Sequence, residues 1–554
     1  MVETIFHKGG GRLNKLTNRP WLKFYSEKNN NLLEIPNRSL YQILERTFHR
    51  FPDATAIIYE GRKMAYRQLK EKVDRLANAW KRLGMKKGDR IGLMLANHPD
   101  YIISYYAAQM LGAIVVQVNP LYTPRELQYI VNDVGMKYIV THDSNRRTLH
   151  QIETEHLKAV FLSNDSNPDA VALTWPSYDL HELIDRSEPL EAYTEIDVHE
   201  DIAVIQYTGG TTGKMKGAML THYNLLANVI QSYAMYSDLL EDGKEVTLAA
   251  TPFYHVFAMT AAMNVSIFSG QAILIVRKFQ VDEVLELIKT YRPSFFPGVP
   301  TMYNAFVNHP NVKAYGLDCL KVCSSGSATL PQEILRRFKE ITGVPILEGY
   351  GLSESSPSTH RNPIHFKRKV GSIGIPIPLT DSKVVDDAGN EVEIGEIGEL
   401  IVKGPQVMKG YWNQPEETAK ALRDGWLYTG DLAKMDEEGY FYIVGRKKEM
   451  IISGGFNIYP QEVEDVLYDH PAVKEAAVIG IPDDYSGERV KAFVVFKEGK
   501  KASEEELIDH CYQHLTRYKV PKEIEIRDAL PRNTVGKLLK RILVEEELKK
   551  RKGS

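Results

Sequence analysis

One short stretch of the chain reads Tyr207-Thr208-Gly209-Gly210-Thr211-Thr212-Gly213-Lys214-Met215-Lys216-Gly217. It holds three threonines, four glycines and two lysines, and it follows the apolar run 202–205, which predicts a strand. Glycines let backbone N–H groups approach phosphate oxygens closely, threonine hydroxyls add donors, and lysines supply positive charge. The stretch therefore predicts a loop that binds a polyphosphate.

This loop differs from the P-loop of the nucleoside triphosphatases. The P-loop needs Gly-Lys-Ser/Thr, with a second glycine five positions before the first. Here Gly213-Lys214 is followed by Met215, and Thr208 stands where the second glycine would be. The sequence excludes a P-loop NTPase and leaves a flexible surface loop as the alternative to a phosphate site.

Length and composition predict a globular protein of at least two domains, because 554 residues exceed what one compact core accommodates. The net charge of -3 gives no sign of a nucleic-acid partner. Cys319, Cys323 and Cys511 form neither a zinc pattern nor a disulfide framework, which favours a reducing compartment. The polar residues 1–23 contain no signal peptide, so we expect a cytoplasmic protein.

Strand and helix patterns alternate in the first part of the chain, which predicts doubly wound α/β layers. The predicted elements are a hairpin over 56–59 and 63–66, a helix over 69–83, strands over 91–95 and 113–118, and a helix over 101–111. The stretch 248–276 lacks Asp, Glu, Lys and Arg and is long enough to span a bilayer. Because Pro252, Asn264 and Gly270 interrupt it, we expect a loop, a buried helix and a strand there.

Several further stretches resemble one known family. They are Asn119-Pro120-Leu121-Tyr122-Thr123-Pro124-Arg125-Glu126-Leu127, Ser325-Gly326-Ser327-Ala328, Glu348-Gly349-Tyr350-Gly351-Leu352-Ser353-Glu354, Trp426-Leu427-Tyr428-Thr429-Gly430-Asp431-Leu432, the run 445–455, and Pro531-Arg532-Asn533-Thr534-Val535-Gly536-Lys537. Together with the phosphate loop they resemble the adenylate-forming enzymes, which include acyl- and aryl-CoA synthetases, luciferases and adenylation domains. The likeness is strongest to bacterial long-chain fatty acid–CoA ligases.

The resemblance implies two domains joined by a hinge. Residues 1–445 would form the large N-terminal domain of doubly wound α/β layers with a β-rich subdomain, and residues 446–449 the hinge linker. Residues 450–554 would form a small, mobile α+β domain. There the sequence predicts helices from Pro460 and over 504–515, with strands over 476–481, 490–496 and near Ile524.

The resemblance also assigns a nucleotide site and a metal site. Tyr350 would stack on adenine, Ser353 would reach the phosphate, and Asp431 would accept both ribose hydroxyls. Glu354 and Thr208 would hold Mg²⁺, since a carboxylate beside a triphosphate requires a metal between them. The full expected ATP/AMP set is Thr208, Gly209, Gly210, Thr211, Thr212, Gly213, Gly326, Ser327, Ala328, Glu348, Gly349, Tyr350, Gly351, Ser353, Asp431 and Arg446.

The expected catalytic residues are Lys537, His255, Thr208 and Lys216. By resemblance Lys537 neutralises the entering carboxylate, and His255 guards the junction between the carboxylate pocket and the thiol channel. A histidine packed in a core is the alternative for His255. The resemblance further places the hinge at Lys448, the CoA channel at Gly454 and Gly455, and the acyl pocket at His255, Phe257, Ala261 and Ala262.

The implied activity is that of an ATP-dependent fatty acid–CoA ligase, which uses Mg²⁺ and coenzyme A and passes through an acyl adenylate. The preference for long chains is implied by the resemblance alone. A medium-chain or aryl acid–CoA ligase and a non-catalytic nucleotide or fatty-acid binding protein are the alternatives. The sequence leaves peripheral membrane contact and a homodimer open, and it predicts no nucleic-acid partner.

Overall fold

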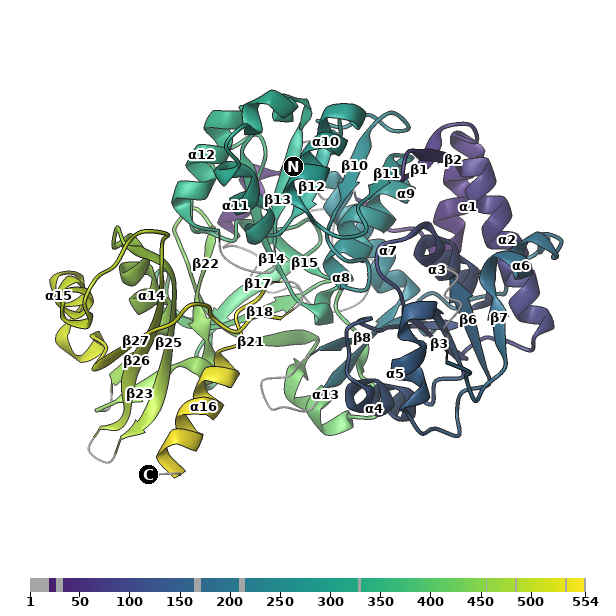
Figure 1. The fold of residues 1–554 in the computed structure, drawn as a ribbon. Helices are drawn as coiled ribbons and strands as arrows, with labels where there is room; N and C mark the ends of the chain where they lie inside the picture. The colour runs from purple at the N-terminus through teal and green to yellow at the C-terminus, as the bar shows by residue number, and fades with distance from the viewer. Residues whose placement is uncertain are drawn as a thin grey trace. The chain divides into compact units, whose positions relative to one another are not determined.

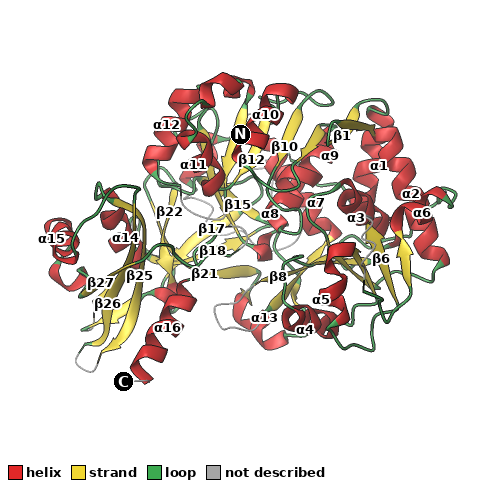
Figure 2. Cartoon of the chain, in the orientation of Figure 1, coloured by secondary structure: helices red, strands yellow, loops and turns green. Residues whose placement is uncertain are grey.

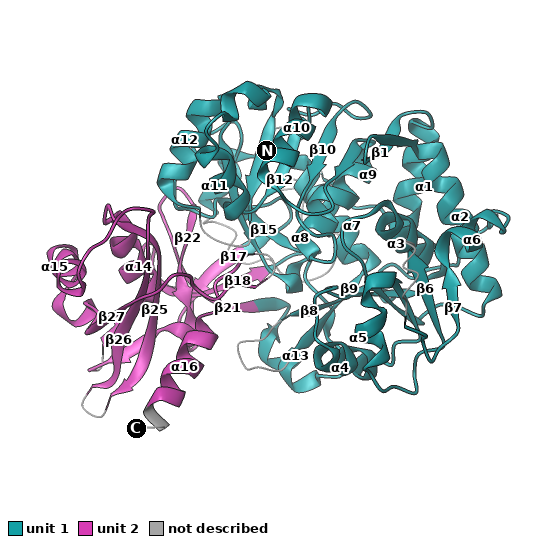
Figure 3. Ribbon diagram, in the orientation of Figure 1, with its two compact units in different colours: residues 1–381, 403–427 teal, residues 382–402, 428–554 magenta. Residues whose placement is uncertain are grey.

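The computed structural model describes residues 19–25, 33–163, 171–208, 215–326, 330–454, 456–483, 486–533 and 536–552. The chain divides into two compact units (Figure 3). Unit 1 contains residues 1–381 and 403–427, and unit 2 contains residues 382–402 and 428–554. The predicted mobile domain, 450–554, falls wholly within unit 2. The predicted hinge at 446–449 concerns motion and stays a prediction.

Unit 1 holds two large sheets, which Figure 1 shows with helices packed around them. The nine-stranded sheet has the order β16 (Ile375–Pro376), β15 (Ser358–Arg361), β14 (Ile346–Gly351), β13 (Val322–Ser325), β12 (Phe295–Gly298), β10 (Val246–Ala249), β11 (Ala272–Ile275), β1 (Thr55–Tyr59), β2 (Arg62–Ala65). The eight-stranded sheet has the order β19 (Gly410–Tyr411), β9 (Lys216–Thr221), β8 (Ile202–Thr208), β4 (Ile114–Gln117), β3 (Arg90–Met94), β5 (Tyr138–His142), β6 (Ala159–Ser163), β7 (Ser177–Asp179).

The nine-stranded sheet is covered by helices on both faces. Its central strands run parallel, and successive residues point to opposite faces. Phe296 and Cys323 join a buried cluster with α10 (Val281–Tyr291), α11 (Pro300–Asn308) and α12 (Gln332–Thr342). Their neighbours Phe295 and Val322 join another cluster with α7 (His222–Ala234) and α9 (Val265–Ser269). This arrangement confirms the predicted doubly wound fold.

The eight-stranded sheet follows the same plan. Strands β4, β5, β6 and β8 contribute to a buried cluster with α4 (Pro124–Val134) and α5 (Arg146–His150). The helices α2 (Tyr66–Arg82), α3 (Pro99–Leu111) and α6 (Leu180–Asp185) pack on one another and against strands of this sheet. The helix α1 (Leu40–Arg50) packs against α2 and α3.

Local sequence signals explain several of these elements. The β1–β2 hairpin closes through a two-residue turn, Glu60 and Gly61, both with positive φ, as tight hairpins require. Helix α4 begins with a capping box in which Thr123 and Glu126 bond each other's backbone, and it ends at Gly135 with φ 59°. The predicted hairpin is confirmed.

The uncharged stretch 248–276 contains buried helix and strand, as predicted. It runs from β10 through α8 (Val256–Ala258), the π-helix η3 (Met259–Asn264) and α9 to β11, and Figure 2 shows these helices in red. Almost all of its side chains are buried in the core. Across the described ranges, every helix is too short or too polar to cross a bilayer.

Unit 2 contains most of one five-stranded sheet and the whole of another. The first has the order β17 (Asp381–Val385), β18 (Gly398–Lys403), β21 (Trp426–Met435), β20 (Leu422–Arg423), with β22 (Phe441–Arg446) paired to β21. The second has the order β24 (Phe456–Ile458), β23 (Ile451–Ser453), β26 (Gly487–Phe496), β25 (Val473–Asp483), with β27 (Glu523–Ile526) paired to β26. Helices α14 (Pro460–Asp469) and α15 (Glu504–His514) cover one face of the second sheet, and α16 (Lys540–Lys552) packs on the other.

Some local predictions were wrong in detail. The strand predicted over 202–205 continues to Thr208, and Lys216 begins β9, so the glycine-rich stretch connects two antiparallel strands. Thr429-Gly430-Asp431, a common turn sequence, lies within β21. In each case strand pairing or core packing outweighs the local turn tendency.

Candidate active site

The base of the phosphate loop is held by helix α4 and by the segment 404–418. Thr208 and Lys216 are paired at the ends of β8 and β9. Tyr129 donates its hydroxyl to the carbonyl of Met215 at 3.2 Å, and Tyr207 donates to Asp133. Gly217 cannot carry a side chain, because a Cβ there would lie 2.7 Å from Ile205 Cγ2. Gly209, Gly210, Thr211, Thr212, Gly213 and Lys214 lie outside the described residues.

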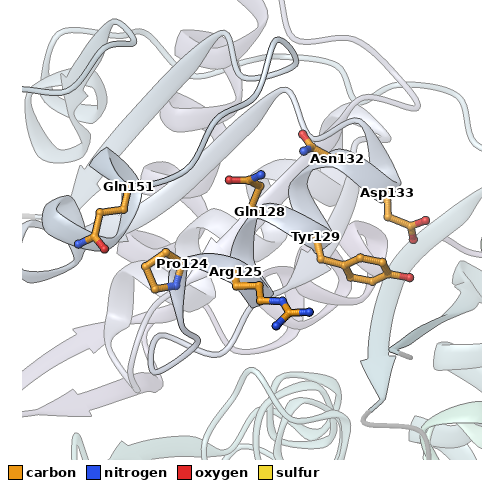
Figure 4. Close-up of a pocket in the computed structure, with 7 residues that line it drawn as sticks. All are labelled: Pro124, Arg125, Gln128, Tyr129, Asn132, Asp133 and Gln151. Carbon is orange, nitrogen blue, oxygen red and sulfur yellow. The ribbon is translucent and has the colours of Figure 1, made fainter. Parts of the chain in front are cut away.

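A surface cavity of about 610 Å³ lies on α4 beside this loop (Figure 4). It is lined by Pro124, Arg125, Gln128, Tyr129, Asn132, Asp133 and Gln151. None of these residues is among the predicted site residues. Tyr129 and Asp133 connect the cavity to the loop through the two hydrogen bonds given above.

Lys216 is anchored by two neighbours. Its ammonium forms an ion pair with Glu417 of α13 (Pro415–Ala421) and lies 5.1 Å from the centre of the Tyr411 ring. Hydrogen bonds from the Lys216 and Lys420 ammonium groups, aided by their positive charges, lower the pKa of Glu417 to about 2. The lysine side chain is only 16% exposed. Lys216 therefore stays at the base of the loop with its charge partly neutralised.

The predicted adenine and metal residues lie on strand β14 of the nine-stranded sheet and just after it. Glu348, Gly349, Tyr350 and Gly351 belong to β14 itself. At Gly351 a Cβ would lie 2.1 Å from the carbonyl oxygen of Pro357, so only glycine fits. Burial raises the pKa of Glu348 to about 7, which keeps this carboxyl partly protonated at neutral pH.

Ser353 and Glu354 form the turn η6 (Ser353–Ser355) just after β14. The backbone carbonyl of Glu354 accepts a hydrogen bond from Met408 N–H at 2.8 Å, and its Oε1 accepts one from the Tyr411 hydroxyl at 2.8 Å. Burial and the nearby Glu354 charge raise the pKa of Tyr411, so its hydroxyl remains a donor. The structure thus connects Glu354 with Lys216 through one tyrosine, which the sequence analysis did not identify.

The donor chemistry at Glu354 fits a divalent cation that is shared with a nucleotide. Among the described residues, no three His, Cys, Asp or Glu side chains gather as metal ligands. A single carboxylate is nonetheless the usual protein contribution when Mg²⁺ takes its other ligands from phosphate and water. Glu354 and Thr208 are the residues that would hold such an ion.

One predicted acyl-pocket residue, Phe257, lies next to one predicted nucleotide-site residue, Gly326. Phe257 lies in the core, and its ring would lie 3.4 Å from a Cβ placed at Gly326. Ala261 and Ala262 are buried in η3. His255 is the N-cap of α8, where its Nδ1 accepts a hydrogen bond from Phe257 N–H at 3.3 Å. Ser327 and Ala328 lie outside the described residues.

Unit 2 brings together the predicted ribose residue and its basic neighbour. Asp431 is 2% exposed, and its Oδ1 lies 3.1 Å from Arg446 Nε on the adjacent strand β22. Lys448 is exposed in the 3-10 turn η7 (Lys447–Glu449) that follows β22. Gly454 ends β23 with φ 56°, a conformation that favours glycine, and Gly455 lies outside the described residues.

Lys537 lies at the end of a short loop in unit 2 and is exposed. Its backbone N–H donates to Asn533 Oδ1 at 2.8 Å, and its carbonyl accepts from Asn533 N–H at 2.9 Å. Arg532 bonds the carbonyl of Gly536 at 2.6 Å and Glu475 Oε2 of β25 at 2.9 Å. Arg532, Asn533 and Glu475 are further residues that sequence reasoning did not assign to a role.

The two large α/β sheets of unit 1, with the smaller sheets of unit 2, define the class of protein as a two-unit α/β fold. The family model of the AMP-binding enzymes matches residues 44–412, and that of the AMP-binding enzyme C-terminal domain matches residues 462–537. The chain belongs to the AMP-binding enzyme family.

Relatives and solved structures match almost the whole chain. A long-chain-fatty-acid–CoA ligase of Bacillus subtilis (strain 168) is 45% identical over 96% of this chain and 98% of its own length. A feruloyl-CoA synthase of Amycolatopsis sp is 36% identical over 88% of this chain and 95% of its own length. The crystal structure of ATP-bound MatB from Rhodopseudomonas palustris superposes with a TM-score of 0.84 at 33% identity, covering 92% of this chain and 99% of that one.

Proposed function

We propose that this enzyme is an ATP-dependent long-chain fatty acid–CoA ligase. The reaction first joins the carboxylate to the α-phosphate of ATP, releasing pyrophosphate, and then transfers the acyl group from acyl-AMP to the thiol of CoA. The connection of Lys216 to Glu354 beside the phosphate loop carries the proposal for the nucleotide chemistry. The long-chain substrate is supported by the more identical of the two relatives, which is named for it, while the aryl relative is more distant.

The first half-reaction brings two anions together, so it depends on positioning and on cations. Thr208 and the backbone of the glycine-rich loop would bind the departing pyrophosphate, with Lys216 supplying positive charge. Tyr350 would stack on adenine, and Asp431 would accept the ribose hydroxyls. Lys537 would bring its ammonium to the attacking carboxylate. Mg²⁺ at Glu354 and Thr208 would supply further positive charge to the phosphates.

The second half-reaction needs a path for the thiol and a polarised acyl carbonyl. We propose that the C-terminal domain, residues 450–554, turns at Lys448 between the two half-reactions, which withdraws Lys537 and brings Gly454 and Gly455 to the thiol. The thiol sulfur then forms the thioester bond, its proton leaves to solvent or a base, and AMP departs. His255 would lie at the junction of the two substrate paths.

The acyl chain would bind beside Phe257, Ala261 and Ala262. Each buried methylene contributes roughly 0.8 kcal/mol, so a deep apolar tunnel favours long chains over short ones. A cytoplasmic location, a homodimer and peripheral membrane contact stay predictions.

The test is carboxylate-dependent ATP–pyrophosphate exchange across a series of fatty and aromatic acids, followed by detection of CoA thioesters. We expect exchange to increase with chain length into the long-chain range and every active acid to yield a thioester. Exchange with aromatic acids alone would replace the fatty acyl substrate with an aryl one. Absence of exchange with any acid, while ATP still binds, would favour a non-catalytic nucleotide-binding protein.

A further inference from the structure

Tyr411 is the side chain at which the cationic and anionic residues of the phosphate site meet. Its hydroxyl donates to Glu354 Oε1 at 2.8 Å, and its ring lies 5.1 Å from the Lys216 ammonium. Lys216 in turn pairs with Glu417. All four residues belong to unit 1.

The backbone holds Tyr411 in place from two sides. Strand β19 is paired with β9, and Tyr411 lies opposite Ala218, two residues after Lys216. The Tyr411 N–H donates to Thr418 Oγ1 at 2.8 Å, in the same helix as Glu417. The side chain is 8% exposed. The tyrosine therefore has little freedom to leave Glu354 or Lys216.

The hydrogen bond uses one of the two carboxylate oxygens of Glu354. The hydroxyl of Tyr411 occupies Oε1, and within the described part of the chain no donor lies within hydrogen-bond distance of Oε2. A carboxylate that is fixed at one oxygen presents the other in a defined direction, which costs less entropy when a cation binds. A charged hydrogen bond of this kind is also among the stronger ones in proteins.

We propose that Tyr411 is a positioning residue for the nucleotide site. Its hydroxyl fixes Glu354 through Oε1 and leaves Oε2 for the divalent cation that accompanies the triphosphate, while its ring supports the ammonium of Lys216. This inference rests on the proposed function, in which Glu354 serves that cation. Two substitutions separate the two contacts: Tyr411→Phe removes only the hydroxyl, and Tyr411→Leu removes the aromatic ring as well.

The experiment measures ATP binding to the full-length enzyme by calorimetry, with Mg²⁺ and with EDTA. We expect Tyr411→Phe to reduce the Mg²⁺-dependent gain in ATP affinity about tenfold and to leave the affinity in EDTA unchanged. Tyr411→Leu should weaken binding in EDTA too, because Lys216 loses its aromatic neighbour. Tyr66→Phe is the matched control, since it removes a buried hydroxyl bonded to Gln271 O at 2.7 Å in the same unit. Tyr66→Phe should leave the ATP affinity unchanged both with Mg²⁺ and with EDTA.

A double-mutant cycle shows whether Tyr411 acts through Glu354. In a Glu354→Gln background, we expect Tyr411→Phe to have no further effect on the Mg²⁺-dependent gain. An equal loss in both backgrounds, or the same loss in Tyr66→Phe, would overturn the inference and reduce Tyr411 to a structural role. If Glu354→Gln alone leaves the gain unchanged, the assignment of Glu354 fails, and the inference with it. If Glu354→Gln abolishes the gain but Tyr411→Phe does not reduce it, only the inference fails.

Discussion

The turn that carries Glu354 and the loop that carries Lys537 are held in opposite ways. Glu354 is fixed by contacts from distant segments, Met408 N–H on its backbone and the Tyr411 hydroxyl on its carboxylate. In the Lys537 loop, Asn533 bonds the Lys537 backbone within the loop, and Arg532 bonds Glu475 of β25 in the same unit. Contacts from distant segments keep a residue in one position, whereas a loop whose contacts lie within one domain can keep its shape while that domain moves. This contrast is what we expect if the Glu354 carboxylate stays in place and the C-terminal domain brings the Lys537 ammonium to the substrate.

The strongest test of this contrast is Lys537→Ala. We expect adenylation to fall about 10²-fold or more, as the loss of transition-state charge stabilisation typically causes. Thioester formation from pre-made acyl adenylate should persist, because the proposed turn at Lys448 withdraws Lys537 in that step. ATP–pyrophosphate exchange and CoA thioester formation measure the two halves, with Lys497→Ala as the control, an exposed lysine bonded to Pro471 O. An equal loss in both halves contradicts the two-arrangement scheme.

Arg532→Ala should reduce adenylation about tenfold, because the loop that presents Lys537 loses its bonds to Gly536 and Glu475 and small displacements of a catalytic group are costly. Thioester formation should again persist. The matched control is Arg541→Ala, which removes an exposed ion pair with Glu545 on α16. The charge-swapped pair Arg532→Glu with Glu475→Arg should recover part of the loss. If Arg541→Ala costs as much as Arg532→Ala, the loss reflects general stability.

In unit 1, on the strand that leads to the Glu354 turn, the carboxyl of Glu348 should make the stability of the protein depend on pH. Its pKa is raised to about 7 in the folded protein, so between about pH 4.5 and 7 the folded state binds a proton that the unfolded chain has lost. Stability should therefore fall as the pH rises through this window. Relative to Glu348→Gln, the wild type should lose about 2.5 kcal/mol of unfolding free energy between pH 5 and 8. Urea unfolding of both proteins at the two pH values measures this, and parallel profiles would show that the carboxyl ionises freely.

The smallest expected effect is a difference in salt dependence between the Lys537 loop and the Glu354 turn. The Arg532–Glu475 pair joins two charges and is partly exposed, so ions screen it, whereas the partly buried Tyr411–Glu354 bond has a neutral donor and is screened less. Raising the ionic strength to about 0.5 M should reduce the ratio of the wild-type adenylation rate to that of Arg532→Ala about twofold. The ratio of the wild-type rate to that of Tyr411→Phe should stay constant. Adenylation rates of the three proteins at two salt concentrations measure this, and equal salt dependence would mean that both contacts are equally accessible.

Strong local signals were sufficient for most of the fold. The β1–β2 turn, helix α14 and the strands of the C-terminal sheet all follow from turn residues, helix-start signals or apolar periodicity. Elsewhere, pairing with distant strands decided the local structure. Thr429-Gly430-Asp431 is a strand because β21 has partners on both sides, and Glu348 to Gly351 extend β14 because β15 pairs with them.

The sequence by itself determined the family resemblance and the chemical type of the candidate residues: a threonine and glycine loop, the carboxyl of Glu354 and the ammonium of Lys537. These features can be recognised from the sequence because each depends only on the residue types within one short stretch of chain. Only the tertiary structure decided that Tyr411 joins Glu354 to Lys216 and that Arg532 anchors the Lys537 loop at Glu475. Such partners are 57 or more positions apart in the chain and meet only when strands pair, which no local pattern records.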